Sequence, residues 1–212
     1  MKPLGALLVI AWFSVGLGSA GIAAEREFDA KLLERGKNIW LTVAGLGCVG
    51  CHGKYGEGDV GVGPYNRGVG QSKVVSAVES VDMMRALLKD KLTREDIEAV
   101  ATYTTWMGQH QLIRTLVKRD RFLPDSIDVF PGTSVQLVVK NTSQSPHKFV
   151  SPNMLVTEFE VAGRDAQDFI WRAPETEGSF TLRCTDCVRK GEDVLTVNVR
   201  RSARRYRVPD PE

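Results

Sequence analysis

Two cysteines and a histidine stand together near the start of the chain, in Cys48-Val49-Gly50-Cys51-His52. Two thiols at this spacing can each form a thioether with one vinyl group of a haem, and the histidine that follows can bind the iron. A redox dithiol, a structural disulfide or part of a zinc site also uses paired cysteines, but none of these needs the adjoining histidine. The motif therefore predicts one covalently bound haem c.

The residues around this motif predict helices. Apolar residues at helical spacing cover 29–46 and 93–108, and the second helix begins at Thr93 with Asp96 three residues later, as in a capping box. A glycine-rich loop, residues 53–70, lies between them. A bound haem would supply the apolar mass that orders this loop.

The second part of the chain changes to short alternating strands from about residue 113. Turn-forming residues separate these strands, a pattern that is typical of a β-sandwich. The predicted strands are Ser126–Phe130, Val135–Lys140, Thr157–Val161, Asp168–Trp171, Ser179–Arg183 and Val194–Val199.

The first residues have the pattern of a signal peptide: Lys2, an apolar core from Leu4 to Leu17, then small residues up to Ala24. We expect residues 1–24 to be removed on export to a periplasm or another exported compartment, an uncleaved anchor being the alternative. The pattern predicts no membrane span after this cleavage.

The charges of the 212-residue chain nearly balance, with 28 basic and 26 acidic residues. This balance gives no argument for binding nucleic acid. Several arginines crowd the C-terminus, either as a solvated tail or as a patch that steers an acidic partner: Arg200, Arg201, Arg204, Arg205 and Arg207.

Residues 29–108 resemble a class I (monohaem) cytochrome c domain. The resemblance rests on Gly36-Lys37, the haem motif through Gly53, the loop from Gly56-Glu57-Gly58-Asp59 to Gly63-Pro64, and Leu92-Thr93-Arg94-Glu95-Asp96-Ile97 leading to Tyr103. It implies an all-α fold, thioethers at Cys48 and Cys51, and His52 as an iron ligand. It also implies that the other ring nitrogen of His52 donates to the backbone carbonyl of Pro64.

The sixth iron ligand in such domains is usually a methionine from a Met-Pro segment before the last helix. This chain has Met83-Met84-Arg85 at about that place, without the proline. We favour Met84, with Met83 as the alternative. Core packing of both methionines, with an open iron, is the other interpretation.

Residues 122–200 resemble a cupredoxin domain, an all-β sandwich. The resemblance rests on Val129-Phe130-Pro131-Gly132-Thr133-Ser134-Val135, Val138-Val139-Lys140-Asn141, Ser145-Pro146-His147-Lys148-Phe149 and Gly178-Ser179-Phe180-Thr181-Leu182-Arg183-Cys184. It puts His147 and Cys184 at the places of two copper ligands. A blue-copper site needs a second histidine and usually an axial methionine, and neither follows Cys184 in this chain.

A second cysteine, Cys187, follows Cys184 with two residues between them. Three interpretations stay open. The pair forms a disulfide, as nearby thiols do in an oxidising compartment; it binds Cu(I) with His147 and with Asp186 or Met154; or the domain has no metal and serves as a docking surface.

These patterns together predict a two-domain protein, an all-α cytochrome c fold followed by an all-β cupredoxin-like sandwich. The predicted parts are a signal peptide (1–24), a cytochrome c domain (25–112), a linker (113–121), a cupredoxin-like domain (122–200) and a basic tail (201–212). We expect an exported carrier of single electrons whose partners are a dehydrogenase, a cytochrome or an oxidase. The alternatives are a haem and copper oxidoreductase or its subunit, and a Cu(I)-handling protein.

Overall fold

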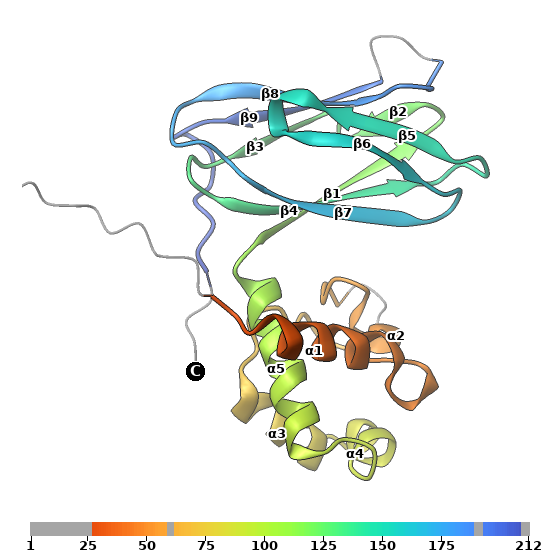
Figure 1. Cartoon of the computed structure of the whole chain (residues 1–212), viewed down its shortest axis with the longest axis vertical. Helices are drawn as coiled ribbons and strands as arrows, with labels where there is room; N and C mark the ends of the chain where they lie inside the picture. Colours follow the sequence, from red (N-terminus) through yellow and green to blue (C-terminus); the bar gives the residue numbers. More distant parts are fainter. Residues whose placement is uncertain (1–26, 59–61, 189–192, 209–212) are drawn as a thin grey trace, which may run out of the picture.

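Helices form the first part of the protein and strands form the second (Figure 1). The computed structural model describes residues 27–58, 62–188 and 193–208. The predicted signal peptide lies outside these residues. In the described chain, the last α-helix ends at Gly108 and the first strand begins at Gln111.

The two predicted helices are present. The described helices are α1 (Ala30–Thr42), the 3-10 turn η1 (Val43–Gly45), α2 (Val49–His52), α3 (Gln71–Ser80), α4 (Asp82–Leu88), α5 (Arg94–Gly108) and, among the strands, the 3-10 turn η2 (Pro152–Met154). α5 starts with the predicted capping box between Thr93 and Asp96. The helix predicted to reach residue 46 instead ends at Thr42, because Ala44 takes a left-handed conformation in η1.

The helices α1 and α5 cross at very short distance. A Cβ atom at Gly36 would lie 2.0 Å from the backbone oxygen of Ala99 in α5, so glycine alone fits at this crossing. Trp40, Tyr103 and Met107 are buried beside it and form the core of the helical part.

Two sheets form the predicted β-sandwich, with strand orders β2-β1-β4-β7 and β3-β9-β8-β5-β6. Most neighbouring strands are antiparallel, whereas β1 is parallel to β4 and β3 is parallel to β9. Phe122, Phe149 and Leu182 are fully buried between the sheets. The strands are β1 (Gln111–Lys118), β2 (Arg121–Leu123), β3 (Ser126–Val129), β4 (Ser134–Asn141), β5 (His147–Ser151), β6 (Val156–Val161), β7 (Ala166–Arg172), β8 (Gly178–Cys184) and β9 (Val194–Val199).

Two boundaries differ from the prediction. Residues 113–121, predicted as a linker, lie in β1 and reach the start of β2, because β1 pairs with β4 from Gln111 onward. The predicted basic tail packs against the fold as far as it is described. The Tyr206 hydroxyl donates to the backbone oxygen of Gly108, and the Arg205 guanidinium lies 5.3 Å from the centre of the Phe130 ring.

A buried arginine joins the helical part to the sandwich. Arg67 is 3% exposed and donates hydrogen bonds to four oxygens: the backbone oxygens of Tyr55 (2.7 Å), Met107 and His110 (3.0 Å), and Oε1 of Gln136 in β4 (2.8 Å). The Gln136 amide in turn donates to Asp168 in β7, at 2.7 Å. One guanidinium therefore connects a loop, the end of α5 and a sheet.

Other contacts cross the same interface. The Lys54 ammonium donates to the backbone oxygen of Ala166, at 2.9 Å. His110 Nδ1 lies 2.8 Å from the Ser134 hydroxyl, and its ring meets the edge of Trp106. Burial, together with the positive charge of Arg67, lowers the pKa of His110 to about 4.

Candidate functional site

The first candidate site is centred on His52 in the short helix α2. The imidazole is 9% exposed, and its Nδ1 lies 2.9 Å from the backbone oxygen of Pro64. A carbonyl oxygen only accepts hydrogen bonds, so this contact places the ring proton on Nδ1. The lone pair of Nε2 is then available to a metal ion, with the ring held in orientation by Pro64.

The loop that carries Pro64 is tied to α2 by its backbone. The Gly63 N–H donates to the oxygen of Cys51 at 2.9 Å, and the Gly58 N–H donates to the oxygen of His52 at 2.8 Å. A Cβ atom at Gly63 would lie 2.5 Å from His52 Nδ1, so glycine is needed for the loop to reach the imidazole.

Cys48 directly precedes α2 and Cys51 lies within it, and both are free, half-buried thiols. Burial raises the pKa of the Cys48 thiol to about 11. Cysteines of redox dithiols have lowered pKa values, which disfavours that interpretation for this pair. A thioether bond to a haem does not need a stabilised thiolate in the finished protein.

The surroundings of these thiols suit a large apolar group. Trp40 is buried with its ring centre 6.1 Å from that of His52, and its indole N–H donates to the backbone oxygen of Lys54 at 3.2 Å. Exposed apolar side chains lie on the segments before and after α2 and on α4, which contacts η1: Leu41, Leu46, Val62, Tyr65, Met83 and Leu87. A haem would cover surface of this kind, so the donor set and its surroundings fit the group.

The two methionines of α4 differ in exposure. Met83 is 56% exposed, whereas Met84 is half-buried. The less exposed side chain is the better candidate for an iron ligand, so Met84 stays the predicted sixth ligand.

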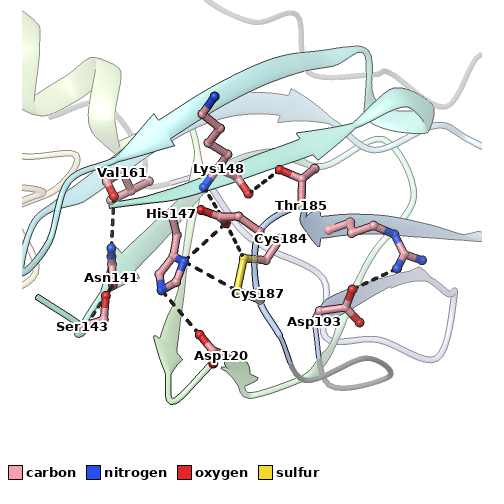
Figure 2. Close-up of a disulfide and its surroundings, with 12 residues drawn as sticks. Asp120, Asn141, Ser143, His147, Lys148, Val161, Cys184, Thr185, Cys187 and Asp193 are labelled. Atoms are coloured by element: carbon pink, nitrogen blue, oxygen red, sulfur yellow. Dashed lines mark hydrogen bonds and ion pairs between the residues drawn. A yellow bond between two sulfur atoms is a disulfide. The ribbon is translucent and has the colours of Figure 1, made fainter. Parts of the chain in front are cut away.

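The second candidate site lies at one end of the sandwich (Figure 2). Cys184, the last residue of β8, is joined to Cys187 by a disulfide. His147, the first residue of β5, is 8% exposed, and its Nδ1 lies 3.9 Å from the Cys187 sulfur. The ligand atoms of these three residues and of Asp186 all lie within 4.8 Å of one another.

Carboxylates flank the His147 imidazole on both sides. Nδ1 lies 3.3 Å from an oxygen of Asp186, and Nε2 lies 3.6 Å from an oxygen of Asp120 (Figure 2). The site therefore combines two sulfur atoms, one imidazole and two carboxylates. The sulfur atoms and the imidazole belong to buried residues, whereas the Asp120 and Asp186 side chains are 26% and 43% exposed.

Residues 99–197 match the family model of the cupredoxin-like domain. The chain contains a cupredoxin-like domain. The match begins within α5 and ends within β9, so it includes β1 and the second candidate site. No match was found among curated proteins.

Several copper proteins of known structure are similar to this cupredoxin-like domain at low identity. Auracyanin A, a blue copper protein of Chloroflexus aurantiacus, is 15% identical with a TM-score of 0.36, over 42% of this chain and 98% of that chain. The metal-binding domain of the Streptococcus pneumoniae D39 Cu(I)-exporting P-type ATPase is 12% identical with a TM-score of 0.37, over 43% and 87%. A purple cupredoxin of Nitrosopumilus maritimus is 16% identical with a TM-score of 0.31, over 41% and 98%.

Asp120 is a residue of the cupredoxin-like domain that sequence reasoning missed. It lies in the turn between β1 and β2 with a positive φ of 64°, where the sequence predicted a linker. The signal that points to β1 is a β-branched residue at every second position, Ile113, Thr115 and Val117. A strand at 111–118 would have placed the following charged turn at an end of the sandwich.

A hydrogen-bonded turn before β5 positions His147. The Asn141 amide is fully buried and donates to the backbone oxygens of Ser145 and Val161, at 2.8 and 3.1 Å. Its own oxygen accepts from the backbone N–H of Ser143. The side chain therefore closes the turn that leads into β5.

Among the residues that the structure describes, no helix is long and apolar enough to cross a bilayer.

Proposed function

We propose that this protein is an exported c-type cytochrome that carries single electrons between redox proteins. The observation that carries the proposal is the 2.9 Å contact between His52 Nδ1 and the backbone oxygen of Pro64. This contact leaves Nε2 to an iron ion, next to two free thiols at the spacing of haem attachment.

Three bonds from α2 and from the residue before it would hold the haem. Cys48 and Cys51 would form the thioethers, and His52 would bind the iron through Nε2. When bound, the haem accepts and releases one electron at its iron. Trp40 would pack beside it and help exclude water, and a thioether ligand from Met84 would raise the reduction potential relative to a second imidazole.

The cupredoxin-like domain would dock a redox partner or add a second redox centre. The partner would be a dehydrogenase, a cytochrome or an oxidase. The arginine-rich segment after β9 offers positive charge for an acidic partner: Arg200, Arg201, Arg204 and Arg205. Steering by this charge would weaken as the salt concentration rises. The proposed location is a periplasm or another exported compartment.

Haem attachment tests this proposal directly. The full chain should be exported from a host that attaches haem c, and a denaturing gel should be stained for covalently bound haem. We expect one haem per protein, and loss of the stained band in Cys48→Ala, Cys51→Ala double variants, because no thioether can form. The matched control is the Cys184→Ala, Cys187→Ala double variant, which should keep the stained band. A wild-type protein without covalent haem contradicts the proposal.

The sixth ligand has its own test in the haem-loaded protein. Met84→Ala should convert the ferric haem from low spin to high spin and lower its reduction potential, because the sulfur ligand is lost. Met83→Ala is the matched control and should leave the spectrum and the potential unchanged. The assignment is wrong if Met83→Ala alone produces these changes.

A further inference from the structure

The cysteine pair of the cupredoxin-like domain can form a disulfide or provide two thiolate ligands for a metal ion. We propose that reduction of the Cys184–Cys187 disulfide opens a site for Cu(I) made of two thiolates and the His147 imidazole. The inference concerns the sandwich alone and does not rest on the haem proposal.

The three donor residues are close together and buried. Cys184, Cys187 and His147 are 1%, 9% and 8% exposed, and the Nδ1 of His147 lies 3.9 Å from the Cys187 sulfur. While the sulfur atoms are bonded to each other they cannot act as thiolates, so the disulfide and the bound metal exclude one another.

The backbone holds the donors in place without help from the disulfide. The Cys184 N–H donates to the backbone oxygen of Asp193 at 2.8 Å, and the Thr185 N–H donates to that of Lys148 at 2.9 Å. The Lys148 N–H donates to the Asp186 carboxylate at 3.1 Å. These bonds tie Cys184 and the residues after it to β5 and to the residue before β9 (Figure 2). We therefore expect the sulfur atoms to stay beside His147 after the disulfide is cleaved.

The number of donors favours Cu(I) over Zn²⁺. A structural zinc site takes four ligands, and the fourth here would have to be Asp186. That carboxylate already accepts the Lys148 N–H, and its side chain is 43% exposed. Two thiolates and one imidazole then remain. Thiolates suit both metals, but three donors fall short of the four that a structural zinc site takes, so the set favours Cu(I).

Asp120 would orient the imidazole. Its carboxylate lies 3.6 Å from Nε2 of His147, beyond direct hydrogen-bond distance, so it acts through its negative charge, which favours a proton on Nε2. The Nδ1 lone pair is then left for a metal ion, on the side where an Asp186 oxygen lies at 3.3 Å and the Cys187 sulfur at 3.9 Å. Asp120 is thus a positioning residue and does not bind the metal.

The chemical step balances with a dithiol as reductant. Two electrons and two protons pass from the dithiol to the Cys184–Cys187 bond, which breaks to give two thiols while the reductant closes its own disulfide. One Cu(I) ion then replaces the two thiol protons, which pass to water. Return to the closed state requires a disulfide oxidant that takes up two electrons.

The test compares oxidised and dithiol-reduced protein after removal of the dithiol without oxygen. Cu(I) is titrated against a coloured competing chelator, in the full chain and also in a Cys48→Ser, Cys51→Ser background. This background separates the result from haem attachment, because it removes the other two thiols of the chain. We expect one Cu(I) per reduced protein, protection of both thiols from alkylation, and less than about a tenth of that occupancy in oxidised protein.

The variants distinguish ligands from neighbours. His147→Gln keeps the cysteine pair and should weaken Cu(I) binding by more than the roughly 10- to 100-fold expected for Asp120→Asn, the typical loss for an orienting partner. Each variant is first checked for native circular dichroism. Equal binding by oxidised protein, no binding by reduced protein, unchanged affinity in His147→Gln, or a preference for Zn²⁺ over Cu(I) would each overturn the proposal.

Discussion

Replacing Arg67 with methionine should lower the free energy of unfolding by about 3–5 kcal/mol. The guanidinium is buried and donates to four oxygens, and methionine can donate to none of them. The acceptors left behind are the backbone oxygens of Tyr55, Met107 and His110 and the side-chain oxygen of Gln136. Arg67→Lys should also destabilise, because an ammonium group lacks the planar fork that reaches several acceptors together.

Denaturant unfolding measures this effect, and Lys54→Met is the matched control. Lys54 crosses the same interface, but its side chain is 47% exposed, so its loss should cost less than about 1 kcal/mol. The His110 imidazole gives a second readout. Burial is the main cause of its lowered pKa and the charge of Arg67 is the next, so Arg67→Met should raise that pKa part of the way from about 4. A loss of stability below 1 kcal/mol would show that the network does not join the two parts.

The substitution Gly36→Ala should destabilise the helical part by about 2 kcal/mol or more, although alanine is the better helix former. The added Cβ would lie 2.0 Å from the backbone oxygen of Ala99 and 3.0 Å from the Cβ of Tyr103. Backbone atoms cannot turn away as a side-chain end can, so α1 and α5 must separate. We expect a lower midpoint in urea and a decrease in the near-ultraviolet circular dichroism of Trp40.

The neighbouring residue provides the control for this crossing. Lys37 is exposed on α1, and Lys37→Ala should change stability by less than about 0.5 kcal/mol. Equal stability of Gly36→Ala and wild-type protein would mean that the two helices do not approach as closely as described.

Features set by neighbouring residues could be predicted from the sequence, and those set by distant partners could not. The Thr93 capping box and the alternating strands β8 and β9 depend on local spacing, and the structure contains them. β1 was missed because its charged end, up to Lys118, follows a predicted helix, and its identity as a strand depends on pairing with β4. β5 was missed because it begins directly after Pro146 and is short.

The candidate sites show the same division. Cys48, Cys51 and His52 lie within five consecutive residues and form a recognisable motif. His147, Cys184 and Cys187 lie in segments that resemble the ligand-bearing segments of cupredoxins. Arg67 lies in a glycine-rich loop, and the residues next to it do not indicate whether its side chain is solvated or buried. Only folding shows that its acceptors come from α5 and β4, some 40 and 69 residues later.

The direct passage from α5 to β1 has a consequence for electron exchange. Domains on a flexible linker move relative to each other by default, and a transfer between them then occurs over a range of separations. Here β1 begins three residues after Gly108 and lies inside its sheet between β2 and β4. An electron passing between a haem at His52 and a copper ion at His147 would therefore cross one fixed distance. The transfer rate would then depend on that distance and not on the motion of one domain relative to the other.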